Sequence, residues 1–121
     1  MKEIASMASP APILRYNDVT FDFFNFEEQS WANGYVIVRN GDMVLCIPDQ
    51  GDDAPYSITG VHHDYWWEGR SSNPERQWET EAVWILLKDV YVGTWVENNL
   101  DYVFRFRLTG TPVNLSDGDD D

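Results

Sequence analysis

Residues 34–47 read Gly-Tyr-Val-Ile-Val-Arg-Asn-Gly-Asp-Met-Val-Leu-Cys-Ile, two apolar runs joined by Asn40-Gly41. An Asn-Gly pair readily adopts the two positive φ angles of a type I′ turn, the two-residue connection of a β-hairpin. Counting outward from the turn gives the register: Arg39 opposite Asp42, Val38 opposite Met43, Ile37 opposite Val44, Val36 opposite Leu45 and Tyr35 opposite Cys46. Both faces of this hairpin are largely apolar, which predicts a central hairpin covered on both sides.

A second hairpin is predicted around Asn98-Asn99, because Asn tolerates positive φ angles. Its register places six side chains on one face: Trp95 opposite Tyr102, Gly93 opposite Phe104 and Tyr91 opposite Phe106. A shift of one residue would bring Arg105 and Arg107 into this aromatic layer, so the pattern specifies a single register. We expect Phe104 to cover the backbone that Gly93 leaves bare.

The rest of the chain also alternates with a period of two, which is typical of strands. Residues 18–23 alternate polar and apolar side chains, and strands are expected at 56–59 and 61–67 with a bulge or bend at Gly60. Residues 74–87 fit either a helix from Pro74 or a short turn followed by a strand from about Thr80, and we prefer the strand. Residues 25–28 resemble a helix capping box, which predicts one short helix before the Asn-Gly hairpin.

Together these patterns predict a mainly β fold, a single small antiparallel barrel or sandwich of about seven or eight short strands with one or two short helical turns. The domain division expected is an extended N-terminal arm at 1–12, one β domain at 13–115 and a disordered acidic tail at 116–121.

Composition narrows the range of functions. The chain of 121 residues has 8 Lys and Arg against 21 Asp and Glu, a net charge of −13. Such a charge disfavours direct binding to nucleic acid, which needs cations against phosphate. No apolar run reaches the roughly 18–20 residues of a membrane span, so no membrane association is expected. One Cys cannot form an intramolecular disulfide, and no stretch resembles a secretory leader, so we expect a cytoplasmic protein.

The residues most suggestive of a site are His62, His63, Asp64, Trp66 and Trp67. On a strand, His62 and Asp64 share one face, as a metal ligand pair or simply as a His–Asp pair at a sheet surface. Trp66 and Trp67 point to opposite faces, so at least one is expected to be partly exposed. Exposed aromatic rings bind sugars or partner side chains. We assign no catalytic residue, because no nucleophile accompanies the histidines, and no metal, because the chain has only two His and these are adjacent. No cofactor is expected.

Cys46 lies between Leu45 and Ile47 in the first hairpin. It is expected to be buried, to behave as a small apolar side chain and to have a raised pKa.

These observations leave several functions open. The leading hypothesis is a non-enzymatic acidic interaction domain that engages a basic protein partner, as inhibitors, immunity proteins and nucleic-acid mimics do. The first alternative is a β domain that binds a glycan or small ligand on Trp and Tyr platforms. The second is an enzyme centred on His62, His63 and Asp64. The charge also fits adaptation to salt or simply solubility, and the sequence does not define the oligomeric state.

Overall fold

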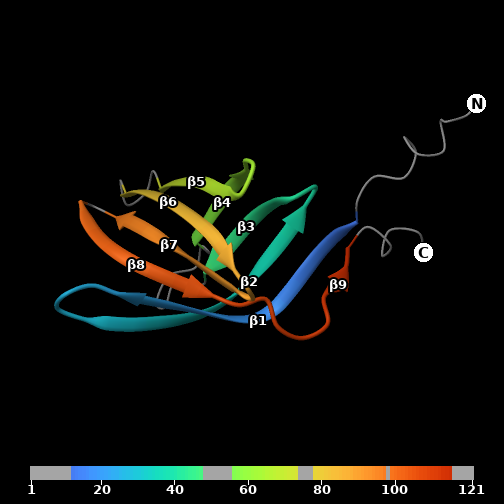
Figure 1. Ribbon diagram of the computed structural model, residues 1–121, viewed down its shortest axis with the longest axis horizontal. Helices are drawn as coiled ribbons and strands as arrows, with labels where there is room; N and C mark the ends of the chain where they lie inside the picture. The colour runs from blue at the N-terminus through green and yellow to red at the C-terminus, as the bar shows by residue number, and fades with distance from the viewer. Residues whose placement is uncertain (1–11, 48–55, 74–77, 98, 116–121) are drawn as a thin grey trace, which may run out of the picture.

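The computed structural model describes residues 12–47, 56–73, 78–97 and 99–115, which contain nine β-strands and no helix (Figure 1). The strands are β1 (Ile13–Phe24), β2 (Gln29–Arg39), β3 (Asp42–Ile47), β4 (Tyr56–His62), β5 (Trp66–Asn73), β6 (Trp78–Leu87), β7 (Val90–Glu97), β8 (Leu100–Phe106) and β9 (Val113–Asn114). Within these residues, no helix has the length and apolar character needed to cross a membrane. The expected arm and tail lie outside the described residues, apart from Pro12.

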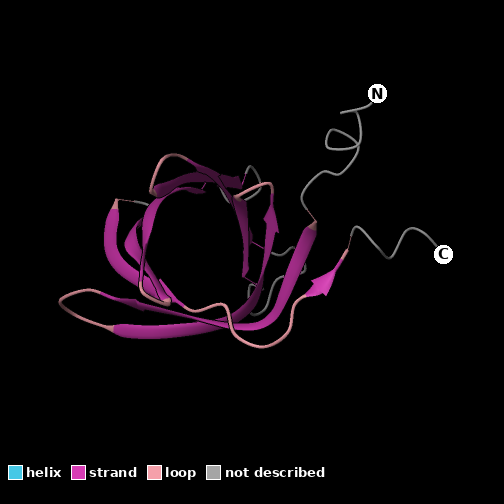
Figure 2. Ribbon diagram, turned by 45° about the vertical axis from the view of Figure 1, so that its right-hand side comes forward, coloured by secondary structure: helices cyan, strands magenta, loops and turns pink. Residues whose placement is uncertain are grey.

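The strands form an antiparallel meander that closes on itself, because β1 pairs with β2 on one side and with β8 on the other. The result is an eight-stranded barrel, seen as a ring in Figure 2, with β9 added beside the start of β1. The pairing of β1 with β2 shifts register between Tyr16 and Val19, where Asp18 has a φ of 58°. Of the two predicted architectures, the protein therefore adopts the barrel.

Both predicted hairpin registers are confirmed. β2 and β3 pair as Tyr35 with Cys46 through to Arg39 with Asp42, and Asn40 and Gly41 have φ angles of 52° and 90°. β7 and β8 pair as Tyr91 with Phe106 through to Glu97 with Leu100. The β2–β3 hairpin is not sandwiched between two layers, however. Its inner face lies in the core and most of its outer face is only half-buried, as in any barrel wall.

The barrel interior is filled by large side chains rather than open. Trp84 is completely buried, with its ring parallel to that of Trp67 at 6.5 Å between centroids and nearly perpendicular to that of Phe104 at 5.9 Å. Six more side chains in this interior have no exposed surface: Val19, Phe21, Val36, Leu45, Ile58 and Phe104. Trp95 and Phe106 are almost as deeply buried. The aromatic face predicted for the β7–β8 hairpin therefore forms much of the core.

Two glycines differ from expectation in their role. Gly60 is not at a bulge: it pairs regularly with Met43 and Gly69, and a methyl group there would lie 2.5 Å from Trp84 Cζ2 and closer still to Cη2. Its missing side chain makes room for the central indole. At Gly93, an added methyl would meet the backbone of Val83 and Trp84, so close approach of β6 and β7 requires this glycine. Gly93 lies opposite Phe104, as predicted, but the close approach of β6 is what excludes a side chain at this position.

The predicted short helix at 25–28 is a tight turn instead. Asn25 Oδ1 accepts hydrogen bonds from the backbone N–H groups of Glu27 at 2.8 Å and Glu28 at 3.0 Å, and Asn25 N–H donates to Glu28 O at 3.0 Å. The ambiguous segment ending at Leu87 is a strand, β6, as preferred from the sequence, and residues 74–77 lie outside the described part of the chain.

Candidate functional site

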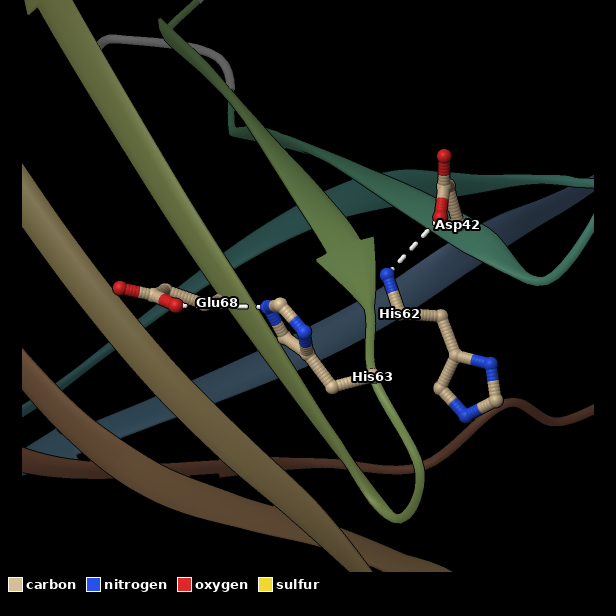
Figure 3. Close-up of polar contacts among 4 residues, drawn as sticks. All are labelled: Asp42, His62, His63 and Glu68. Atoms are coloured by element: carbon tan, nitrogen blue, oxygen red, sulfur yellow. Dashed lines mark hydrogen bonds and ion pairs between the residues drawn. The ribbon is translucent and has the colours of Figure 1, made fainter.

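The residues singled out from the sequence lie at the barrel end formed by the β2–β3 and β4–β5 turns. His62 is the last residue of β4, and its backbone N–H donates to Asp42 Oδ1 at 2.8 Å (Figure 3). Its ring stacks on that of Trp67 at 4.6 Å between centroids. Trp67 in turn donates from Nε1 to the Gly41 carbonyl at 2.7 Å. His62 and Trp67 therefore fasten β4 and β5 to the Asn-Gly turn.

His63 makes a separate set of contacts on the outside of the barrel. Its ring stacks on that of Trp66 at 4.7 Å, and its Nε2 lies 3.3 Å from Glu68 Oε1. Figure 3 shows the two imidazole rings pointing in different directions, with the His63 ring beside Glu68 and the His62 ring directed away from both Glu68 and Asp42. The expectation that His62 and Asp64 share a strand face fails, because β4 ends at His62 and Asp64 lies in the connection to β5. Four of the five residues form two stacked pairs, His62 with Trp67 and His63 with Trp66, rather than one cluster that includes Asp64.

No metal centre is formed in this region. Within the described ranges, no group of three or more His, Cys, Asp or Glu side chains is placed to hold a metal ion. Glu68, rather than Asp64, supplies the carboxylate next to His63. The arrangement therefore gives the histidines packing and pairing partners.

The prediction for the tandem tryptophans is confirmed. Trp67 is 8% exposed and packs in the core, whereas Trp66 faces outward and is half-buried. Tyr65, which is 73% exposed, meets Trp66 edge-on at 5.0 Å between centroids. Tyr65, Trp66 and His63 thus form a small aromatic group on the outer surface.

The opposite end of the barrel carries a second group of polar and aromatic residues, which we call the acidic end: Phe26, Glu27, Glu28, Glu97 and Tyr102. The Tyr102 hydroxyl donates to Glu28 Oε1 at 3.0 Å, which links the β1–β2 turn to β8. This hydrogen bond, partial burial and the nearby charges of Glu28, Glu97 and Glu27 all raise the pKa of Tyr102. Three carboxylates therefore act on one phenol at this end.

Phe26 is the most exposed of the large apolar side chains in the described residues. It stands at the tip of the turn with an exposure of 105%, and the Asn25 hydrogen bonds described above fix the backbone on either side of it. An open hollow of about 500 Å³ lies between residues 24–29 and Arg105 of β8. Sequence reasoning missed this feature because it assigned residues 25–28 to a helix.

Cys46 is buried, as predicted, although it lies on the outward-facing side of the β2–β3 hairpin. Burial is the main cause that raises the pKa of its thiol, while its hydrogen bond with Tyr35 acts in the opposite direction. The Arg15 guanidinium lies 3.9 Å above the Tyr35 ring. Tyr35 and Arg15 thus form a cover next to the thiol.

The chain matches no protein-family model, and no curated protein or solved structure shows significant similarity to it. Its class is therefore defined by architecture: a closed antiparallel barrel of eight strands with one additional strand and an aromatic interior.

Proposed function

We propose that this protein is a non-enzymatic acidic interaction domain that binds a basic protein partner through the acidic end of the barrel. The observation that carries the proposal is Phe26, a fully exposed ring on a turn held by three hydrogen bonds and followed directly by Glu27 and Glu28. An exposed ring with an ordered backbone is a favourable anchor, because little conformational entropy remains to be lost on binding.

The charge of the chain supports the choice of a basic partner. At −13, the protein attracts cations at long range and raises the rate of encounter with them. Three of its arginines, Arg70, Arg105 and Arg107, are already within 4 Å of a carboxylate of the same chain. Glu27, Glu28 and Glu97 lie together around Tyr102 and supply the local negative charge. Lys and Arg side chains also pack well on an aromatic face such as that of Phe26.

The filled interior supports an external binding surface as well. Trp84, Phe21 and Phe104 occupy the space in which larger barrels hold a ligand. The separation of His62 from His63 weighs against the enzyme hypothesis. The cytoplasmic location expected from the sequence remains part of this proposal.

The test is affinity capture from native lysate at about 50 mM and 500 mM NaCl, conditions that change the Debye length about threefold. Capture with the wild type is compared with Phe26→Ala and with the double variant Glu27→Gln/Glu28→Gln. Asp64→Asn/Asp89→Asn is the control, because it removes the same charge from turns at the other end. We expect the wild type to capture a basic protein that is released at the higher salt concentration. Both acidic-end variants should fail to retain this protein, and the control variant should retain it. Equal capture by all four proteins would overturn the proposal.

The aromatic group of Tyr65, Trp66 and His63 favours a second candidate, the binding of a glycan or small ligand on the outer surface. Trp66 is half-buried and Tyr65 is largely exposed, as in platforms that stack on sugars. Titration with an oligosaccharide library, followed by tryptophan fluorescence, tests it. A saturable change that Tyr65→Ala and Trp66→Ala abolish, and that is independent of salt, would favour this function over the first.

A further inference from the structure

Two polar side chains lie next to each other on the inner side of the barrel wall, at the acidic end. Thr80 of β6 pairs in register with Glu97 of β7. Both belong to the inward-facing set, because Ala82 and Trp95, two residues away on the same strands, are buried in the core. Side chains opposite each other in an antiparallel pair have Cβ atoms about 4.5–5.5 Å apart. The Thr80 hydroxyl and the Glu97 carboxylate are therefore neighbours.

The two side chains differ in how their hydrogen bonds are satisfied. Glu97 is half-buried, and its Oε1 accepts a hydrogen bond from Trp95 Nε1 at 3.0 Å. Thr80 is 1% exposed, and its hydroxyl has no hydrogen-bond partner among the described residues. A buried polar group without a partner destabilises the folded state, so its presence calls for an explanation. A ligand that donates a hydrogen bond to Thr80 Oγ1 would provide one.

Aromatic rings and a second carboxylate lie beside this pair. Tyr102 of β8 is opposite Trp95, and its hydroxyl donates to Glu28 Oε1 at 3.0 Å. Figure 1 shows the start of β8 and the β1–β2 turn at the same end of the barrel. Glu28 also lines the open hollow of about 500 Å³ next to Phe26. It therefore connects the inward-facing pair to the surface on which the proposed function depends.

These groups match a lysine side chain better than other cations. An ammonium carries three N–H donors and binds separate acceptors, such as a carboxylate oxygen and a hydroxyl. The planar guanidinium of arginine prefers both oxygens of one carboxylate, and at Glu97 one oxygen already accepts from Trp95. In the described ranges, no group of three or more His, Cys, Asp or Glu side chains is placed to hold a metal ion. The rings of Trp95 and Tyr102 suit the apolar stem of a lysine.

We propose that the basic partner inserts a lysine side chain at the acidic end, where its ammonium binds the Glu97 carboxylate and the Thr80 hydroxyl. The inference rests on the proposed function for the existence of a basic partner, and it adds which side chain of that partner is recognised. Phe26, Glu27 and Glu28 attract and hold the partner on the outside of the barrel end. Thr80 and Glu97 select lysine.

The test uses small probes and needs no partner. Nα-acetyl-lysine methylamide is titrated into the ¹⁵N-labelled full chain, and the indole N–H signals are followed by NMR. Trp95→Phe identifies the signal of the indole that donates to Glu97. The arginine analogue and the uncharged norleucine analogue are titrated in parallel. We expect saturable binding of the lysine probe with a dissociation constant on the order of 1 mM, as its small size allows. The arginine probe should bind at least fivefold more weakly, and the norleucine probe should not bind.

Three variants separate recognition from overall charge and from stability. Glu97→Gln keeps an oxygen for Trp95 Nε1 but removes the charge, and it should weaken lysine binding at least tenfold. Thr80→Val replaces the hydroxyl with a methyl group of similar size. It should weaken lysine binding at least threefold while the melting temperature stays the same or rises, because an unsatisfied hydroxyl is removed. Glu81→Gln is the matched control, since it removes the same charge from the exposed outer side of β6 and should bind lysine like the wild type.

Three results would overturn the inference. The first is no saturable shift with the lysine probe up to about 20 mM, well above the expected dissociation constant. The second is equal binding of the lysine and arginine probes. The third is an equal loss in Glu97→Gln and Glu81→Gln, which would mean that the probe responds to net charge alone.

Failure of the lysine site and failure of the proposed function are separate results. Phe26→Ala should bind the lysine probe like the wild type, although it fails to retain the partner. Specific probe binding by a protein that captures nothing from lysate would contradict the proposed function and support the site. Salt-sensitive capture that Glu97→Gln leaves unchanged would support the proposed function and contradict the site.

Discussion

Replacing Gly60 with alanine tests how the aromatic interior is built. In a strand, alanine normally has an advantage of roughly 0.5–1 kcal/mol over glycine, since glycine loses more conformational freedom on folding. Propensity alone therefore predicts that Gly60→Ala stabilises the protein. The structure predicts the opposite sign, because the added methyl group would overlap the six-membered ring of Trp84.

The magnitude follows from how firmly Trp84 is held. The overlap could be relieved only by moving an indole that has no exposed surface and is packed against Trp67, Phe104 and Phe106. Overpacking in a tight core costs typically 1–3 kcal/mol, and the bulk and confinement of this ring place the expected cost at about 3 kcal/mol. For a domain of this size, such a loss lowers the melting temperature by about 10 °C.

The assay is urea unfolding of four proteins: wild type, Gly60→Ala, Trp84→Phe and the double variant. Phenylalanine lacks the indole atoms that meet the new methyl group, but by itself it leaves a cavity that costs about 2–3 kcal/mol. The double variant should therefore be more stable than the sum of the single effects allows, by about 2 kcal/mol. Thr59→Ala, at an exposed neighbouring position on β4, should change stability by less than about 0.5 kcal/mol. A Gly60→Ala protein as stable as the wild type, or strictly additive effects in the cycle, would refute this account of the core.

Three further predictions concern single contacts. Glu28→Ala should lower the raised pKa of Tyr102, which can be measured by ¹³C NMR of the phenol. The pKa of Tyr102 is higher in the folded state than in the unfolded state. The stability that this contact contributes is therefore present below about pH 10 and is lost as the pH rises further. A pKa unchanged by the substitution would contradict the hydrogen bond. Cys46 should react slowly with a thiol reagent in the native protein, because its thiol is buried. Tyr35→Ala should increase the reaction rate at least tenfold. Equal rates would mean that Tyr35 does not shield the thiol. Trp67→Phe should cost about 2 kcal/mol in urea unfolding, because it removes ring volume and the donor to a turn carbonyl; a cost near zero would show that this bond does not stabilise the turn.

The two hairpins could be read from the sequence because each is a local structure with a single workable register. Asn40-Gly41 fixes the turn, and the aromatic face between Tyr91 and Phe106 excludes a shift by one residue. Closure into a barrel could not be read in the same way. It depends on β1, which pairs with β8 at the far end of the chain and whose register with β2 shifts between Tyr16 and Val19. The polar pair Asn17-Asp18 interrupts the alternation of this strand and hides its length.

The misassigned turn at Asn25 shows a different limit. A side-chain oxygen that accepts hydrogen bonds from the N–H groups two and three residues ahead is present in a helix cap and in a tight turn alike. The residues that follow decide between them, and here Gln29 begins a strand that pairs with Phe24. The role of Gly60 was hidden for a similar reason, because it depends on Trp84, which is two strands away. Local patterns could therefore predict the hairpins but not the acidic end or the packing around Trp84.

The filled interior has a consequence for any function of this barrel. Trp84 and its neighbours occupy the centre, so a partner or ligand would have to bind on the outer surface or at an end of the barrel. The acidic end combines one sign of charge with an aromatic ring on an ordered turn, whereas the group of Tyr65, Trp66 and His63 at the other end combines stacked rings with the ion pair of His63 and Glu68. Coulomb attraction to a basic protein falls with ionic strength, while stacking of a ligand on aromatic rings depends little on it. A single salt series, measured once by capture of a basic partner and once by tryptophan fluorescence with a glycan, therefore separates the two regions.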